Sequence, residues 1–443
     1  MFKNNARKIP LAALMFVSVP APASAAFAAD AFDPKNAYGV VAGVLSWKDK
    51  SFTAYPVKNR KDKELYDALV ARGASAENLA LLLDRAATRD AVYAAVKEKA
   101  AKAPAGSTFI FYYAGHGVNR EGKGAFFAGY DIDRKKAEES GVSPEVIGGI
   151  IGQNFKGSKV ILLADCCYSG ALQTTAQMLS GGPVTASALT SASASNTSAG
   201  AWTFSQTVID AVAGRALLDR DGDGFITFGE LSLEIADAMK YRERQLSGSF
   251  VPEAMKNAVV SEVKERGPAR TSSGAFSTGE YISVPGKAGA RTAQILEIRG
   301  GDYLAEFYDY SDKVVSTVPA AGAAKIEFKN YPAGSDVNVM WGERPYAAKI
   351  LKVQDGFHWI TYPGWSHSWD EWVMSDRIIE TPAGSGAGGP VLSGAEGQVS
   401  VEWSGSCYPA VVLKKKAGRA FVHYAGYESS WDEWVGPERL NCK

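Results

Sequence analysis

The stretch TFIFYYAGHG, residues 108–117, decides the fold, because a wholly apolar run leads directly into a glycine-flanked histidine, His116. The stretch KVILLADCCYSG, residues 159–170, repeats this plan and ends in Asp165 and a pair of cysteines. Short apolar runs of this kind are typical of strands buried on both faces of a parallel sheet. Parallel strands end at the same edge of their sheet, so we expect His116 and Cys167 to lie close together.

The segments around these two runs alternate between strand and helix patterns. The pattern predicts strands at residues 38–45, 79–83 and 184–189, and helices at 62–72, 88–103, 144–153, 204–217 and 231–244. Residues 169–200 are rich in Ser, Thr, Ala and Gly, which predicts a mobile loop around the strand at 184–189. We therefore expect an α/β domain over residues 38–284, with a mostly parallel sheet sandwiched by helices.

The composition of the chain limits the kinds of molecule that it is expected to bind. The chain has 443 residues, enough for several domains, and its 48 Lys and Arg are balanced by 48 Asp and Glu. Nucleic-acid binding is not expected without a basic excess.

The first 28 residues have the features of a signal peptide. Basic residues precede an apolar run at 10–19, and small residues at 23–28 offer cleavage sites. The apolar run is well short of the ~20 residues that span a bilayer, so we expect no membrane anchor. These features predict export to a bacterial periplasm or to the medium.

The C-terminal third contains an internal repeat. Residues 335–380 and 398–443 align without gaps, and both contain Trp-Asp-Glu-Trp-Val, at 369–373 and 431–435. A weaker copy at 287–330 lacks this signature, and residues 381–397, dense in Gly, Ala, Ser and Pro, form the expected linker. We expect each copy to be a small β-barrel.

The two strand-end motifs have the residue types of a cysteine nucleophile and its base. An imidazole can take the proton of a thiol and pass it to a leaving amine. A buried cysteine and a structural histidine are the plain alternative for each motif alone. Together, a Tyr-Ala-Gly-His-Gly motif and an Asp-x-Cys-x-Ser-Gly motif, with Cys167 51 positions after His116, are more specific.

In these motifs residues 38–284 resemble the caspase-like clan of cysteine peptidases, within it the bacterial metacaspase-like branch. The resemblance implies that His116 is the general acid/base, that the Gly117 amide is an oxyanion donor and that Cys167 is the nucleophile. Cys166 falls on the variable position of the motif. The alternative is a catalytically inactive caspase-type scaffold that carries the barrels.

The resemblance also places Asp165 in the S1 pocket, where a carboxylate favours Lys or Arg in the substrate. A structural Asp165 that holds its loop through backbone amides is the alternative. Residues 171–214 contain no Lys or Arg, so an enzyme of this specificity could not cut itself there, and we expect a single uncut chain.

A calcium site is predicted at residues 219–230. Oxygen ligands at loop positions 1, 3, 5 and 12 with glycine at position 6 match an EF-hand loop. The expected ligands are Asp219, Asp221, Asp223, the Phe225 carbonyl, Thr227 and Glu230. The alternative is a solvated acidic turn. Metacaspase relatives are often calcium-dependent, although their activating site need not be this loop.

The repeats resemble chromo-barrel or Tudor-knot domains, which are SH3-like barrels. Clustered aromatic rings can hold an ammonium group by cation–π attraction, or they can simply fill the core of a small barrel. The candidate ligand-binding side chains are Tyr362, Trp369, Trp372, Tyr424, Trp431 and Trp434. If the protein is exported, the ligands available to these barrels are a peptide, a glycan or a cell-wall amine.

The last expectation is a disulfide between Cys407 and Cys442. At the repeat offset their counterparts are Pro345 and Glu380, so both cysteines occur in one copy and neither in the other. An oxidising compartment would allow them to pair. Two separate free thiols are the alternative.

Overall fold

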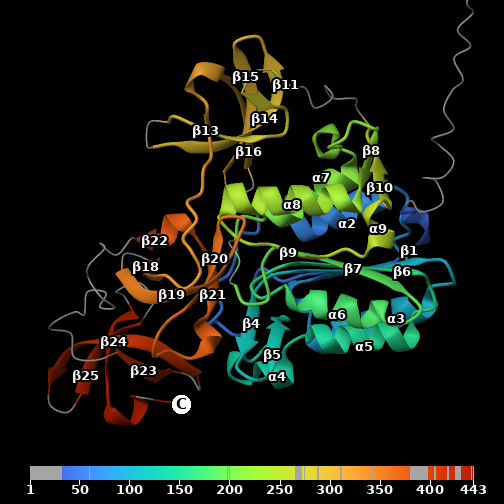
Figure 1. Ribbon diagram of the computed structural model, residues 1–443. Coiled ribbons are helices and arrows are strands. Elements are labelled where there is room, and N and C mark those ends of the chain that lie inside the picture. Colours follow the sequence, from blue (N-terminus) through green and yellow to red (C-terminus); the bar gives the residue numbers. More distant parts are fainter. Residues whose placement is uncertain are drawn as a thin grey trace, which may run out of the picture.

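Six strands form one mostly parallel sheet in the computed structural model (Figure 1). Its order is β2-β1-β3-β6-β7-β9, and only β9 runs antiparallel to its neighbour. The strands are β1 (Ala37–Gly43), β2 (Leu79–Leu83), β3 (Thr108–Ala114), β6 (Lys159–Asp165), β7 (Thr185–Thr190) and β9 (Gly248–Phe250). The structure describes residues 32–442 except 59, 197, 199, 265–271, 274, 287–288, 310–311, 342–343, 380–397, 404–405, 417–418, 425–430 and 441. The predicted signal peptide and the 381–397 linker lie outside the described residues.

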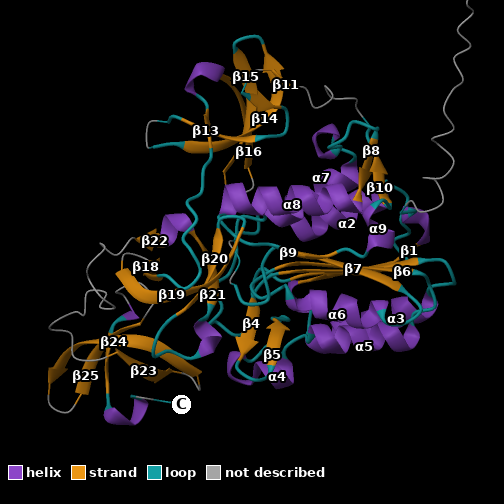
Figure 2. Cartoon of the chain, viewed as in Figure 1, coloured by secondary structure: helices purple, strands orange, loops and turns teal. Residues whose placement is uncertain are grey.

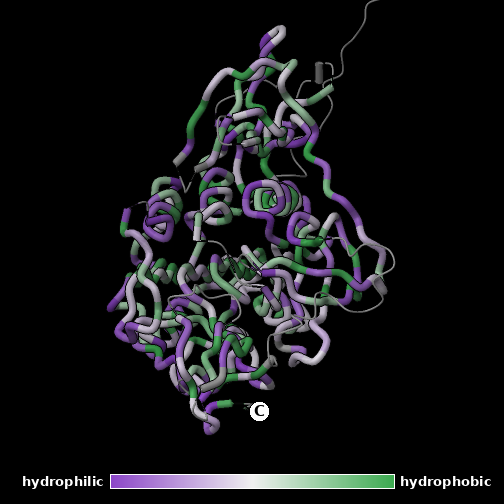
Figure 3. Tube along the Cα trace, turned by 90° about the vertical axis from the view of Figure 1, so that its left-hand side faces the viewer, coloured by the Kyte–Doolittle hydropathy of each residue, from purple (hydrophilic) through white to green (hydrophobic). Residues whose placement is uncertain are grey.

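Helices cover both faces of this sheet (Figure 2). One face carries α2 (Lys61–Ala71), α7 (Thr203–Ala213) and α8 (Phe228–Glu243), and the other carries α3 (Arg89–Lys102), α5 (Pro144–Asn154) and α6 (Ala171–Ser180). Successive side chains of a strand point to opposite faces, so Phe109 and Phe111 enter one core while Ile110 and Tyr112 enter the other. Both sets of side chains are buried, so β3 is covered along its whole length; Figure 3 shows the hydropathy of the residues along the chain trace. The mixed α/β class expected from the sequence agrees with this architecture.

Several helices begin where the sequence predicts them. The Thr88 hydroxyl accepts a hydrogen bond from the backbone N–H of Ala91, and the Ser143 hydroxyl does the same for Val146. The helix α6 corrects the prediction of a mobile loop over 169–200. Its buried residues Leu172, Ala176 and Leu179 have helical spacing, which the small, polar composition of the segment concealed.

Short elements complete this part of the chain. They are the hairpin β4 (Gly117–Arg120) and β5 (Gly124–Phe127), the helices α4 (Ala137–Ser140) and α9 (Glu253–Lys256), the pair β8 (Phe225–Thr227) and β10 (Val259–Glu262), and the pair β11 (Ser272–Ser273) and β12 (Phe276–Ser277). The hairpin β4–β5 directly follows His116.

Three small antiparallel sheets follow. The first contains β13 (Tyr281–Val284), β14 (Arg291–Arg299), β15 (Asp302–Asp309), β16 (Asp312–Pro319) and β17 (Ala324–Lys325). The second contains β18 (Asp336–Trp341), β19 (Arg344–Gln354), β20 (Phe357–Thr361), β21 (Glu371–Met374) and β22 (Ile378–Ile379), and the third β23 (Gln398–Trp403), β24 (Ser406–Lys416), β25 (Arg419–Tyr424) and β26 (Glu433–Val435). We call them barrels 1, 2 and 3. Strand β13 lies within the range expected for the catalytic domain but pairs with β14 of barrel 1.

Among the described residues, no helix has the length and apolar character needed to cross a bilayer.

Cys407 and Cys442 are joined in barrel 3, with their Cα atoms 5.9 Å apart and a sequence separation of 35. We expect unreduced tryptic digests to contain the two cysteines in one linked peptide pair. Replacing both by serine should destabilise barrel 3 by about 4 kcal/mol, because the unfolded chain gains loop-closure entropy. Mass spectrometry and thermal unfolding measure both effects, with Cys166→Ala as the thiol control. Separate peptides that alkylate freely would contradict the pairing.

Candidate active site

The backbone register places His116 and Cys167 at one edge of the sheet. Ala114, the last residue of β3, is paired with Asp165, the last residue of β6, and the Gly115 N–H donates to the Asp165 carbonyl at 3.2 Å. His116 and Cys167 therefore begin from neighbouring strand ends. Gly117 comes so close to the second loop that a Cβ added there would collide with the Cys167 carbonyl oxygen. This close approach explains the glycine.

The His116 ring is held on both nitrogens. Nε2 lies 2.8 Å from the Thr53 carbonyl oxygen, and Nδ1 lies 3.1 Å from the Tyr55 hydroxyl. Because a carbonyl only accepts, the proton of the neutral ring is on Nε2, and Nδ1 accepts from Tyr55. Nδ1 is thus the nitrogen with a lone pair to offer a thiol.

Aromatic side chains surround this imidazole. Ring centroids of Trp47 and Tyr55 lie 4.6 and 4.7 Å from that of His116, and Phe52 lies at 5.5 Å. Burial among these rings lowers the pKa of His116, against the hydrogen bond to Thr53, which raises it. The ring is therefore neutral at pH 7.

Cys167 and Cys166 have different environments. Cys166 is 2% exposed and packs in the core, whereas Cys167 is partly exposed. The Cys167 sulfur accepts a hydrogen bond from the Ser198 N–H at 3.2 Å. Burial raises the pKa of the Cys167 thiol, while the amides of Ser198 and Gly117 oppose this rise. Both groups are thus disfavoured in their charged forms, the thiol of Cys167 as well as the imidazole of His116.

The residue after Cys167 has an unusual backbone conformation. Tyr168 has a φ of 58°, in the left-handed region that non-glycine residues seldom adopt. Its N–H donates to the Asn196 carbonyl at 2.8 Å. This turn directs the chain away from the strand, and α6 begins four positions after Cys167.

Asp165 is enclosed rather than open to solvent. It is 3% exposed, and its Oδ2 accepts hydrogen bonds from the Ser205 N–H at 3.1 Å and the Ser205 hydroxyl at 2.6 Å. Burial raises the pKa of Asp165 to about 6, and the bonds from Ser205 limit the rise. This geometry favours the structural alternative for Asp165, in which the carboxylate holds the start of α7.

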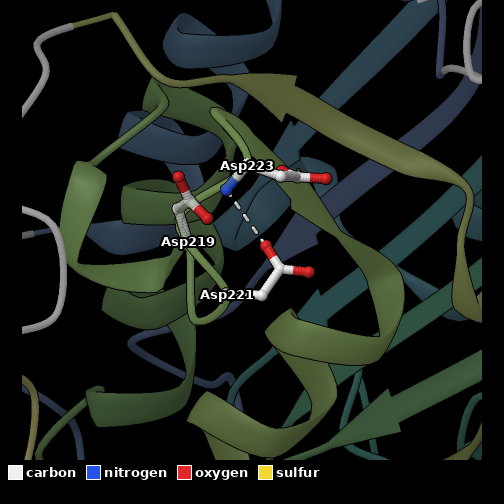
Figure 4. Close-up of side chains that lie close together, drawn as sticks. All are labelled: Asp219, Asp221 and Asp223. Atoms are coloured by element: carbon white, nitrogen blue, oxygen red, sulfur yellow. Dashed lines mark hydrogen bonds between the residues drawn. The ribbon is translucent and has the colours of Figure 1, made fainter. Parts of the chain in front are cut away.

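The loop at 219–230 gathers three of its six expected ligands. One carboxylate oxygen each of Asp219, Asp221 and Asp223 lies within 4.8 Å of the others (Figure 4). Glu230 is used otherwise, because its Oε1 accepts from the Arg220 N–H at 2.6 Å and its Oε2 from the Thr227 N–H at 2.8 Å. With Thr227 it forms the capping box of α8.

The aromatic clusters of barrels 2 and 3 match each other. In barrel 2 a pocket is lined by Trp341, Tyr346, Tyr362, Trp365 and Trp369, together with Pro409 of barrel 3. The corresponding cluster of barrel 3 is made by Trp403, Tyr408, Tyr424 and Trp431. Trp372 and Trp434 lie elsewhere, packed on Trp359 and Phe421 respectively. The sequence prediction therefore missed Trp341, Tyr346 and Trp365, which the alignment of repeated aromatics could have indicated.

The two predicted tyrosines belong largely to the barrel cores. Tyr362 and Tyr424 are each 4% exposed. In both copies the tyrosine hydroxyl donates to a glutamate that also binds an arginine; the two sets are Tyr362, Glu371 and Arg377, and Tyr424, Glu433 and Arg439. Their hydroxyls thus have a structural role, and the tryptophans supply the accessible rings.

The side chains that position His116 were also missed by the sequence prediction. Trp47, Phe52, Thr53 and Tyr55 all lie in the loop after β1. A signal was present, since three aromatics directly follow a strand whose carboxyl end is at the same edge of the sheet.

Comparison with known proteins gives only short similarities. No family model matches the chain. It is 38% identical over 71 residues to the NuA4 complex subunit EAF3 homolog of Drosophila melanogaster and 35% identical over 54 residues to Protein MRG1 of Arabidopsis thaliana, covering 13% and 11% of this chain. The matches span 16% and 17%, about one sixth, of those two proteins. They support the chromo-barrel resemblance and do not bear on the peptidase resemblance.

Among solved structures, protein GSU0716 of Geobacter sulfurreducens aligns with 52% of this chain and 99% of its own, at 16% identity and a TM-score of 0.32. A similarity this low carries no argument.

The electrostatics of the site predict how the thiols react. Iodoacetamide should modify Cys167 and leave Cys166 unmodified in the folded protein. Because burial holds the Cys167 pKa above its ordinary value of 9.0, its alkylation rate should rise with pH and reach no plateau below pH 9. Fragment-ion mass spectrometry can assign the modified cysteine. A plateau with a midpoint below pH 7 would instead indicate a thiolate–imidazolium pair.

Proposed function

We propose that this chain is an exported cysteine-type endopeptidase in which Cys167 is the nucleophile and His116 the general acid/base. The observation that carries the proposal is that His116 and the partly exposed Cys167 follow neighbouring strand ends of a parallel sheet, where Gly117 packs against the Cys167 carbonyl. The buried Cys166 is poorly placed to attack a substrate. The short chromo-barrel similarities neither favour nor oppose this chemistry.

The proposed reaction begins from the neutral pair. Nδ1 of His116 takes the thiol proton as the Cys167 sulfur attacks the peptide carbonyl carbon, after the Tyr55 hydroxyl gives up its bond to Nδ1. The Gly117 amide donates to the oxyanion. His116 then protonates the leaving amine, and water hydrolyses the thioester to release the acid and restore the thiol.

For the substrate, we propose cleavage after Lys or Arg through Asp165. Its pKa of about 6 leaves the carboxylate charged at pH 7, although Ser205 occupies one of its oxygens. Because Asp165 has the structural role in this geometry, bonded to Ser205 of α7 and 3% exposed, the proposal requires the start of α7 to move when substrate binds.

The nucleophile assignment separates the two neighbouring cysteines. Cys167→Ala should abolish hydrolysis of Arg- and Lys-terminated fluorogenic peptides, whereas Cys166→Ala should keep most of it, because a small buried side chain replaces another. Asp-terminated peptides serve as the substrate control. Equal loss in both variants, with Cys166→Ala shown to be folded by circular dichroism, would contradict the assignment.

We also propose that calcium binds the 219–230 loop, supported by the three converging carboxylates. If Glu230 gave up its capping-box hydrogen bonds and turned its carboxylate to the ion, it would supply the ligand expected at position 12 of the loop.

Glu230→Gln should weaken calcium binding by at least about tenfold, since it removes a charge from the ligand set. Glu253→Gln, at an exposed glutamate outside the loop, is the matched control. Calorimetry on the full chain measures both. Absence of binding to the unmodified protein at millimolar calcium would return the loop to a solvated acidic turn.

A second candidate is an inactive scaffold whose barrels bind a peptide or cell-surface ligand. It is favoured by the aromatic pocket of barrel 2, where the buried Tyr346 hydroxyl has no hydrogen-bond partner among the residues that the structure describes. A ligand with a polar or ammonium group would satisfy this hydroxyl and face the indole rings. Pro409 of barrel 3 lies at the same pocket and would have to move aside.

A further inference from the structure

The side chain of Asn196 joins barrel 2 to the loop that follows β7, and this loop also contacts Tyr168 and Cys167. Its Nδ2 donates to the Trp372 carbonyl at 2.8 Å, and its Oδ1 accepts from the Trp372 N–H at 3.0 Å. One amide side chain thus bonds both backbone groups of a residue in β21, as a neighbouring strand would. Asn196 is 8% exposed, so these bonds are shielded from water.

The backbone of Asn196 faces the opposite way, toward the nucleophile. Its carbonyl accepts from the Tyr168 N–H at 2.8 Å, and Tyr168 directly follows Cys167. Two positions after Asn196, the Ser198 N–H donates to the Cys167 sulfur at 3.2 Å. The same short turn therefore contacts both the barrel and the thiol.

The hydrogen bond from Ser198 has a defined chemical effect. An amide N–H directed at sulfur stabilises the thiolate and lowers the thiol pKa, in opposition to burial. This effect depends on the position of the amide and thus on what holds the turn.

We propose that Asn196 is a positioning residue through which barrel 2 sets the position of the Ser198 amide at Cys167. The proposal rests on Cys167 being the nucleophile. It makes barrel 2 a regulatory part of the enzyme, because any partner that shifts β21 also shifts a donor to the reacting sulfur.

Other contacts between the barrels and the catalytic domain provide controls. The Ser366 hydroxyl of barrel 2 donates to Glu121 at 2.7 Å, and Arg120 donates to Ser406 of barrel 3 at 2.8 Å. Both involve the β4–β5 hairpin, at Glu121 in its turn and Arg120 in β4, and are separate from the hydrogen bonds of Asn196. Ser366→Ala thus removes a docking contact of barrel 2 and leaves the turn in place.

The test compares Asn196→Ala with Ser366→Ala in the full-length chain. We expect Asn196→Ala to slow iodoacetamide alkylation of Cys167 at pH 8 by about fivefold, the size of one ordinary hydrogen bond. In peptide hydrolysis kcat should fall with little change in KM, because the substrate is not contacted. Ser366→Ala should match the unmodified protein in both assays.

Several outcomes would overturn the proposal. Unchanged or faster alkylation in Asn196→Ala would show that the turn is not held through this side chain, and an equal effect in Ser366→Ala would show general loosening of barrel 2. If Asn196→Ala does not fold, Asn196→Asp keeps the acceptor for the Trp372 N–H and should show a smaller slowing. If the unmodified chain cleaves no peptide, the peptidase proposal fails, while the alkylation comparison still decides the role of Asn196.

Discussion

The parallel pairing of β3 with β6 is the constraint on which the site depends. Its register ends both strands at the same level, so that Ala114 is opposite Asp165 and the next residues of each strand enter facing loops. The pairing is fixed by wholly buried runs in the middle of the sheet, where slippage by one residue would exchange the contents of the two cores. The geometry of His116 and Cys167 is therefore a consequence of packing far from the surface.

The same burial that fixes the geometry also sets the charge state. Aromatic walls around His116 and a partly covered Cys167 disfavour both charged forms, and two backbone amides partly offset this at the sulfur. In the proposed reaction the thiol keeps its proton until the Tyr55 hydroxyl leaves Nδ1 of His116. Its reactivity is then set by the placement of hydrogen-bond donors more than by a permanent ion pair.

The sequence predicted the elements in which the pattern of hydrophobic residues is strong. It missed features that depend on contacts between residues far apart in the chain. Strand β2 was predicted with the bounds observed, because a continuous apolar run ended by a polar residue has few other interpretations. Helix α6 was taken for a loop, since threonine and serine between its buried residues weakened the helical pattern. Tyr55, 61 positions before His116, became recognisable only when the fold brought the loop after β1 to the same edge.

The barrels are joined to the catalytic domain by buried polar contacts as well as by the chain. Glu306 of barrel 1 is 2% exposed and binds both Arg215 and Arg242, and Tyr308 donates to the Ala201 carbonyl beside the catalytic loop. Buried ion pairs of this kind contribute little net stability, but removing one partner is costly. Such an interface is either made completely or lost, so barrel 1 does not behave as a loosely tethered binding module. Together with the Asn196 contact of barrel 2, these contacts join barrels 1 and 2 to the α/β domain through buried polar groups.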